Sequence, residues 1–101
     1  MIMQRGGSVY IMTNALRIVV YVGVTSDLRN RVFEHRTHFY KGSFTDNYNC
    51  TICVYFCHYS SINEAIATEK QIKKWSRKKK DELITAMNPK WEDLWKEIET
   101  W

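Results

Sequence analysis

The segment VVYVGVTSDLRNRVFEH, residues 19–35, contains the strongest local signals in this chain of 101 residues. Its first part is a run of β-branched and aromatic residues that ends at Gly23, which is typical of a strand. A polar turn follows, in which Thr25 or Ser26 is placed to cap a helix and Asp27 falls in the first helical turn. The segment therefore predicts a strand, a turn and a helix.

The predicted helix has an apolar stripe formed by Leu28 and Val32, and Arg31 and His35 lie one turn apart beside that stripe. An arginine at the edge of a core can pair with a buried carboxylate, or it can direct its planar guanidinium at a phosphate. A histidine there can be structural or can transfer a proton. The pattern alone leaves both interpretations open.

The stretch at residues 8–13 and the first strand of the opening segment, residues 18–23, are rich in strand-forming residues and predict a short hairpin with Asn14 in its turn. Their apolar character indicates a sheet that is covered on at least one face. Tyr10 lies on the first strand and Tyr21 on the second. Both fit as ordinary sheet aromatics, and either could act as a general base only with a lowered pKa or a proton relay.

Downstream, residues 38–49 have the composition of a loop, and residues 50–59 predict a third strand. Ser61 and Glu64 form a capping box, which indicates a helix that runs to about Trp75.

Glu69 falls near the middle of the apolar stripe of that helix. A carboxylate in this position is costly unless it is paired, protonated or bound to a cation. It can form a buried salt bridge with an arginine or a lysine. It can also bind a divalent metal, for which Mg²⁺ or Mn²⁺ would suit a carboxylate oxygen.

A further helical stretch is predicted from Ser76 to Met87, followed by a break at Asn88 and Pro89. We expect a last helix with Asn88 as its cap and Pro89 at its first position. Its apolar face would consist of Trp91, Leu94, Trp95, Ile98 and Trp101. The predicted order of elements is ββαβααα, a small α/β or α+β domain.

The charge is unevenly distributed. Residues 1–80 contain 13 Lys and Arg against 5 Asp and Glu, whereas residues 81–101 contain 2 against 6. A basic body suits a polyanionic partner such as nucleic acid. No apolar run is long enough to span a bilayer, and the stretch MIMQRGGS has no signal-peptide core. We therefore expect a soluble, cytoplasmic protein without a membrane partner.

The run KKWSRKKK, residues 73–80, is the most basic segment. It can follow a phosphate backbone with Trp75 as a stacking group, or it can be a solvated helix face with Trp75 in the core. In the first case the substrate-binding side chains would be those of Lys73, Lys74, Arg77 and Lys78.

The three cysteines lie in the third predicted strand. In a regular strand Cys53 and Cys57 share one face about 13 Å apart, too far for a disulfide, while Cys50 and His58 share the other. The four side chains therefore cannot collect around one zinc ion, and we expect free thiols.

Over roughly residues 8–95 the chain resembles the GIY-YIG nuclease superfamily. That superfamily includes the N-terminal nuclease domain of a bacterial excision-repair protein, phage homing endonucleases and small stand-alone bacterial proteins, and the resemblance is closest to the last group. The matching elements are Ser8-Val9-Tyr10, Tyr21-Val22-Gly23, the segment DLRNRV (27–32) with His35, and EAIATEKQIKKW (64–75) with Glu69. The resemblance implies one domain over residues 1–101, with a motif core at about 8–76 and a helical extension at 77–101. It also implies a three-stranded antiparallel sheet flanked by helices.

The resemblance further implies roles for single residues. Tyr10 and Tyr21 match active-site tyrosines, one of which would help to deprotonate the attacking water. Arg31 matches an arginine that steadies the phosphate, and His35 occupies a position that is often His or Tyr. Gly23 would let the backbone pass close to the substrate. In addition, Glu69 matches the carboxylate that binds one divalent cation, Mg²⁺ or Mn²⁺.

The chain departs from the family pattern at three points. Ser8 replaces the first glycine, Val24 offers no lysine to assist the base, and Asn88 is the nearest candidate for a late asparagine. We expect an endonuclease that acts on DNA or structured nucleic acid, with a protein partner as a possible source of specificity. The alternatives are a catalytically weak nucleic-acid-binding module and a partner-interaction domain that presents the helix at 89–101.

Overall fold

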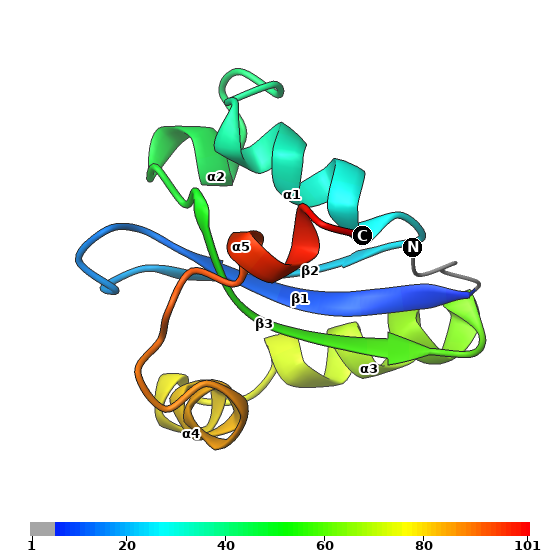
Figure 1. Ribbon diagram of the computed structural model, residues 1–101. Helices are drawn as coiled ribbons and strands as arrows, with labels where there is room; N and C mark the ends of the chain where they lie inside the picture. The colour runs from blue at the N-terminus through cyan, green and yellow to red at the C-terminus, as the bar shows by residue number, and fades with distance from the viewer. Residues whose placement is uncertain (1–5) are drawn as a thin grey trace.

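The computed structural model describes residues 6–101 (Figure 1). The first five residues of the stretch MIMQRGGS, for which the sequence predicts no signal peptide, lie outside the described residues. The elements are β1 (Gly7–Thr13), β2 (Val20–Thr25), α1 (Leu28–Arg36), α2 (Phe44–Asn47), β3 (Ile52–Tyr59), α3 (Ile62–Lys73), α4 (Arg77–Met87) and α5 (Trp95–Ile98). None of the helices in this part of the chain has the length and apolar character needed to cross a membrane.

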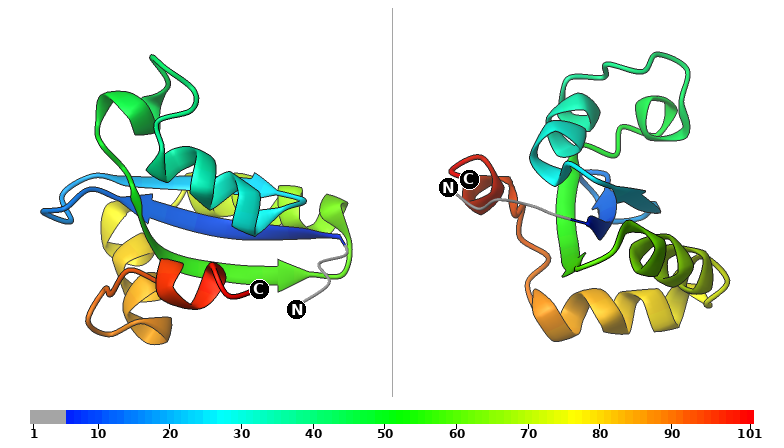
Figure 2. Two further views of the ribbon diagram at one scale, coloured as in Figure 1. Left: turned by 45° about the horizontal axis from the view of Figure 1, so that its top comes forward. Right: turned by 90° about the vertical axis from the view of Figure 1, so that its right-hand side faces the viewer.

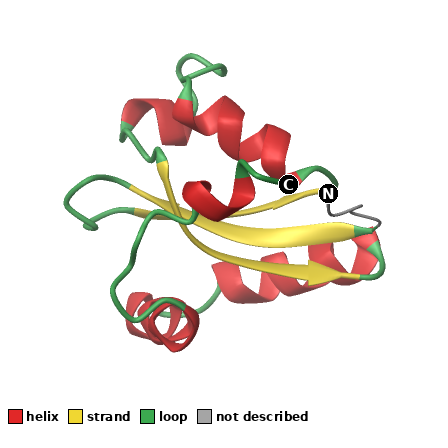
Figure 3. Cartoon of the chain, in the orientation of Figure 1, coloured by secondary structure: helices red, strands yellow, loops and turns green. Residues whose placement is uncertain are grey.

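The three strands form one antiparallel sheet in the order β2-β1-β3, so β1 is central and β2 is an edge strand (Figure 3). This confirms the predicted three-stranded sheet flanked by helices. In the register of β1 and β2, Tyr10 lies opposite Gly23 and Met12 lies opposite Tyr21. Because directly opposed residues point to the same face, the two tyrosines share one face of the sheet.

Helices cover both faces of the sheet, with α1 and α5 on one side and α3 and α4 on the other (Figures 1 and 2). The side chains of β1 alternate between these two cores. The core on the α3 side consists of Val9, Ile11, Val22, Val54, Tyr55, Ala65, Ile72 and Ile84. The core on the α1 side consists of Tyr10, Met12, Leu28, Val32, Cys50, Cys53 and Ile98.

A bulge in β3 changes the predicted positions of the cysteines. Ile11 pairs with Tyr55, but the next residue, Met12, pairs with Cys53, so Val54 is an extra residue in β3. Cys53 therefore belongs to the α1-side core, whereas Cys57 packs against the α3-side core. The expectation that these two thiols share a face was wrong, because it assumed a regular strand.

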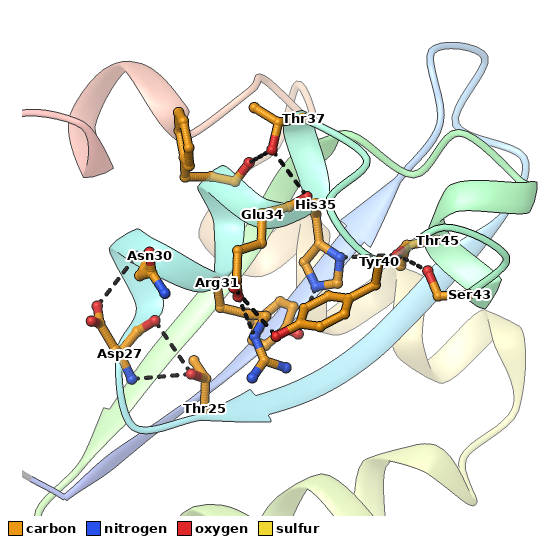
Figure 4. Close-up of polar contacts among 12 residues, drawn as sticks. Thr25, Asp27, Asn30, Arg31, Glu34, His35, Thr37, Tyr40, Ser43 and Thr45 are labelled. Atoms are coloured by element: carbon orange, nitrogen blue, oxygen red, sulfur yellow. Dashed lines mark hydrogen bonds and ion pairs between the residues drawn. The ribbon is translucent and has the colours of Figure 1, made fainter.

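The start of α1 also differs from the expectation. Asp27 is the N-cap, and its carboxylate accepts a hydrogen bond from the backbone N–H of Asn30 at 3.2 Å. Neither Thr25 nor Ser26 caps the helix, because β2 continues as far as Thr25. The Thr25 hydroxyl instead accepts a hydrogen bond from the backbone N–H of Asp27, which fixes the tight turn between strand and helix (Figure 4).

The segment predicted as a loop contains the one-turn helix α2. Ser43 caps it by accepting a hydrogen bond from the N–H of Asp46 at 3.3 Å. In α3, Ser61 is the N-cap as predicted, and the helix ends at Lys73 rather than at Trp75. The predicted order of elements therefore holds except for the additional short helix.

The predicted helix starting at Pro89 was wrong. The last helix begins only at Trp95, and Asn88 does not cap it. The buried Asn88 amide instead donates hydrogen bonds to the carbonyls of Val54 and Glu92 and accepts one from the N–H of Glu92. These bonds hold the chain against β3 after α4, so a turn replaces the first part of the expected helix.

The predicted apolar face of the C-terminal segment is divided between the two cores. Trp91 packs against the α3-side core, while Leu94, Trp95 and Trp101 pack against the α1-side core. The chain passes around the sheet between these positions (Figure 2). The tryptophans are therefore used within the fold, which argues against the segment 89–101 as a presented interaction helix.

Candidate active site

Tyr10 lies at the centre of the candidate site and is fully buried on β1. Its hydroxyl lies 2.8 Å from Nε2 of His35 on α1. A Cβ atom at Gly23, the residue opposite it, would overlap the Tyr10 ring and hydroxyl. Gly23 is thus required for the tyrosine to lie flat against β2, which is a packing role that the sequence did not reveal.

His35 connects the tyrosine to α2. Its Nδ1 lies 2.9 Å from Oγ1 of Thr45, and that oxygen lies 3.3 Å from Oγ of Ser43 (Figure 4). Burial, assisted by the positive charge of Arg31, lowers the pKa of His35 to about 4. The ring is therefore neutral at pH 7, with one nitrogen as donor and the other as acceptor.

Arg31 lies beside Tyr10 and interacts electrostatically with its phenol. The Tyr10 hydroxyl and the Thr45 hydroxyl occupy the two nitrogens of the His35 ring. Arg31, Tyr10, His35 and Thr45 therefore form one connected polar group.

The two tyrosines have different environments. Burial raises the pKa of Tyr10 well above its ordinary value, the proximity of Tyr21 adds to this, and Arg31 opposes it. Tyr10 is therefore a protonated hydrogen-bonding group at neutral pH. Tyr21 is only partly buried, and its ring centroid lies 6.5 Å from that of Tyr10 and 5.8 Å from that of His35. Tyr21 is thus the more accessible of the two tyrosines.

Arg31 is held from the side of its Nε atom. Nε donates to Oε1 of Glu34 at 3.1 Å, and Tyr40 donates its hydroxyl to Oε2 of the same carboxylate at 3.3 Å. The guanidinium also lies 5.9 Å from the centroid of the Tyr40 ring. This clamp engages Nε and not the two terminal nitrogens, which are the atoms that fork onto a phosphate.

Glu69 approaches the edge strand β2 from the α3 side of the sheet. Its side chain is nearly buried on α3, and Oε2 lies 3.2 Å from Nζ of Lys73. The same Nζ lies 5.7 Å from the centroid of the Tyr21 ring on edge strand β2. Lys73 therefore links the carboxylate to Tyr21 around the edge of β2. The structure brings Tyr10, Tyr21, Arg31 and His35 into one cluster, with Glu69 next to it through Lys73.

The donors near Glu69 are compatible with a weakly held Mg²⁺ or Mn²⁺ and not with an ion enclosed by protein. Within residues 6–101, no three His, Cys, Asp or Glu side chains gather into a possible metal cage. Mg²⁺ is commonly held by one or two carboxylates together with water and substrate phosphates. The Lys73 side chain is 48 % exposed, so it can turn toward solvent and release the carboxylate.

The remaining basic candidates do not join the tyrosine cluster. Arg77 donates from Nε to Asp81 at 2.7 Å and from its terminal nitrogens to the carbonyls of Arg17 and Ile18, which fastens the β1–β2 turn to α4. Lys78 is exposed on α4, on the opposite side of the sheet from α1 (Figure 1), and Lys74 is exposed at the end of α3.

Trp75 shows a similar structural role within the basic run. It packs against the α3-side core, and Nζ of Lys79 lies 4.2 Å from its ring centroid. Of the basic run at 73–80, the residue that contacts the tyrosine cluster is therefore Lys73, and Arg77 and Trp75 help to hold the fold together.

Three residues of the cluster were missed by the sequence interpretation, namely Glu34, Tyr40 and Thr45. Glu34 follows Arg31 by three positions on the same helix, so the spacing of the pair could have indicated their contact. Thr45 could not be found in this way. It reaches His35 only because a segment predicted as a loop folds into α2.

One of three comparisons with known proteins gives a match. The comparison with curated proteins gives no significant match, and neither does the comparison with solved structures. The family model described as the GIY-YIG catalytic domain matches residues 6–82, a range that contains every residue of the cluster described above. The chain therefore belongs to the GIY-YIG family, whose catalytic domain is of the nuclease type and implies a nucleic-acid substrate.

Proposed function

We propose that this protein is a metal-dependent endonuclease that hydrolyses phosphodiester bonds in DNA or structured nucleic acid. The observation that carries the proposal is the polar group formed by Arg31, Tyr10 and His35, with Tyr21 and the Glu69–Lys73 pair at the same edge of the sheet. Hydrolysis of a phosphodiester needs an activated water and stabilisation of charge at the phosphate. The residues of this edge can supply both.

Arg31 would bind the scissile phosphate. Its Nε is held by Glu34, so its terminal nitrogens are oriented without help from the substrate. A guanidinium that is positioned in advance stabilises the negative charge that develops on the phosphate oxygens. Tyr10 and His35 would act as positioning residues, because they are buried beside Arg31 and bonded to each other.

Tyr21 is the better candidate for assisting the attacking water. It is the more accessible tyrosine, and the Lys73 ammonium lies beside its ring, where it stabilises negative charge that develops on the phenol. Tyr10 is less suited to the task, because its raised pKa keeps it protonated.

Glu69 would hold a divalent cation, Mg²⁺ or Mn²⁺. When bound, such an ion supplies Lewis-acid stabilisation to phosphate oxygens. Lys73 would release the carboxylate and keep its ammonium beside the Tyr21 ring, which its half-exposed side chain allows.

The test is cleavage of a panel of labelled DNA and RNA, including flaps, branches and plain duplexes, with Mg²⁺ or Mn²⁺. We expect Glu69→Ala and Arg31→Ala to lower the rate by about a hundredfold or more, as the loss of one charge-stabilising group usually does. Matched controls are Glu64→Ala on α3 and Arg29→Ala on α1, both exposed, which should stay within about twofold of wild type.

The wild type cutting nothing on the panel with either metal would contradict the proposal. Binding with a steep salt dependence but without cleavage would instead support the alternative of a catalytically weak binding module. Circular dichroism of each variant separates loss of chemistry from loss of fold. If Glu69→Ala unfolds the protein, Glu69 acts mainly as a buried ion-pair partner of Lys73.

A further inference from the structure

A row of aromatic rings leads from Tyr21 onto the surface of α2. The ring centroids of Tyr21 and Phe44 lie 5.7 Å apart with an interplanar angle of 29°, which is a stacked arrangement. Phe44 in turn lies 4.6 Å from Tyr48. Phe44 is 45 % exposed and Tyr48 is 52 % exposed, so the row starts in the candidate active site and ends in solvent.

Two further aromatic residues lie just before this helix. Phe39 is 64 % exposed and contacts Tyr40 edge-to-face at 4.9 Å, and Tyr40 lies over Arg31. Exposed large aromatics that gather in one region of a surface usually mark a binding site. We refer to Phe39, Tyr40, Phe44 and Tyr48 as the α2 aromatic surface.

The α2 aromatic surface is held firmly in place. Asp46 accepts hydrogen bonds from the N–H of Gly42 and from Nδ1 of His38, both at 2.8 Å. Thr45 anchors the buried side of α2 to His35. The exposed rings are therefore positioned relative to the candidate catalytic cluster before any ligand arrives, which reduces the entropic cost of binding.

The charges around these rings fit a polyanion. Arg31 lies under Tyr40, and Lys73 lies over Tyr21. The carboxylates of Glu34, Asp46 and Glu69 are each paired, with Arg31, His38 and Lys73 respectively. Positive groups beside exposed rings are the combination that binds single-stranded nucleic acid, with phosphates on the cations and bases on the rings.

We propose that Phe44 and Tyr48 stack the unpaired bases of a single-stranded or splayed segment whose scissile phosphate lies at Arg31. This inference rests on the proposed function and specifies its substrate class. A paired base is not accessible to such stacking, because its faces are covered by its neighbours in the duplex. The enzyme should thus prefer tails, flaps and other unpaired segments to intact duplex, with little dependence on base sequence.

The test measures binding separately from cleavage. Fluorescein-labelled dT12, U12 and a 20-bp duplex are titrated with protein in EDTA, and fluorescence anisotropy gives the Kd values. We expect Phe44→Ala with Tyr48→Ala to raise the Kd for dT12 about tenfold or more and to leave the Kd for the duplex within about twofold. The ratio of the Kd values for dT12 and U12 tells whether the protein prefers single-stranded DNA or RNA.

Two further variants control for the loss of any exposed aromatic residue and for poor folding of the double variant. Phe33→Ala is the matched control, because Phe33 is 52 % exposed on α1 but contacts Trp95 on another side of the helix. It should leave the Kd for dT12 within about twofold. Tyr48→Ala alone keeps the Tyr21–Phe44 contact, so it remains informative if the double variant is poorly folded. It should raise the Kd for dT12 by a smaller factor.

The possible outcomes distinguish the two proposals. Unchanged dT12 affinity in the double variant overturns the stacking proposal, even if the wild type cleaves DNA. If the double variant binds dT12 more weakly and the wild type cleaves nothing, the stacking proposal is supported and the proposed nuclease activity is contradicted. A change from dimer to monomer in sedimentation, without a change in dT12 affinity, would show that the rings contact a second copy of the chain and would also overturn the proposal.

Discussion

The two faces of the sheet are built from the same three strands but have different chemistry. On the α3 side, Val9 and Ile11 of β1 pack into a largely apolar core. On the α1 side, Tyr10 from the same strand joins a buried hydrogen-bonded chain with His35 and Thr45. One strand thus contributes to an ordinary core and to a polar network at once.

The difference indicates which face is organised for chemistry. Buried polar groups cost stability unless every one is satisfied, and an aliphatic core would be the simpler solution. Among residues 6–101, every buried side-chain nitrogen or oxygen has a hydrogen-bond partner. The polar network is therefore complete, and its outer end is Arg31, which is only partly buried. We interpret it as a support that fixes Arg31 in place.

Tyrosines on the two faces provide the sharpest test of this comparison. Tyr21 lies on the α1 side, whereas Tyr55 is buried in the α3-side core. We expect Tyr21→Phe to lower the single-turnover cleavage rate by about a hundredfold, the lower range for loss of a general acid or base. Tyr55→Phe should leave that rate within about twofold. Equal effects of the two substitutions would mean that the faces do not differ in function.

Glycine substitutions test the packing beneath the polar network. Gly23→Ala would push Cβ into the Tyr10 ring, and we expect it to lower the free energy of unfolding by about 2 kcal/mol and to reduce cleavage as well. Gly42→Ala is the control, since its positive φ of 81° predicts a cost of about 1 kcal/mol without any clash. Urea unfolding gives both values. Full activity in Gly23→Ala would show that Tyr10 need not be held against β2.

The smallest expected effect concerns pH. Because the pKa of His35 is lowered to about 4 from an ordinary value near 6.5, the unfolded chain takes up a proton before the folded protein does. The contribution of His35 to stability is thus complete above about pH 6.5 and decreases as the pH falls toward 4. We expect a loss of about 1–2 kcal/mol over that range, below the full linkage value because the ring is partly solvated.

The matched variant for the pH experiment is His35→Gln, which cannot titrate. Its free energy of unfolding, measured in urea at several pH values from 7 down to 4.5, should fall less steeply than that of the wild type. Parallel curves for the two proteins would show that the buried imidazole does not titrate as described.

The strands and the long helices follow from local patterns. The β-branched runs specify β1 and β2, and the capping serines Ser61 and Ser76 specify where α3 and α4 begin. Local patterns did not reveal α2, because its four residues show no periodicity. They also misplaced the last helix. Asn88 and Pro89 have the composition of a helix start, but the buried bonds of Asn88 to β3 determine a turn instead.

The candidate site could be predicted only in part. The resemblance to the GIY-YIG superfamily named Tyr10, Tyr21, Arg31, His35 and Glu69 together, and the structure brings four of them into contact. The substrate-binding role expected for Arg77 could not be judged from the sequence. An arginine in a basic run has the same local pattern whether it faces a phosphate or, as here, an aspartate and two carbonyls.

The most direct test of the central claim, that one metal-dependent site extends around the edge of β2, is paramagnetic broadening by Mn²⁺. The ¹⁵N-labelled protein, bound to a short DNA with a non-cleavable phosphorothioate, is titrated with Mn²⁺ and followed by amide NMR. We predict selective broadening of the amides around Glu69 on α3 and around Tyr21 on β2, and its loss in Glu69→Gln. Broadening centred on the acidic residues after position 90, or broadening that persists in Glu69→Gln, would contradict the claim.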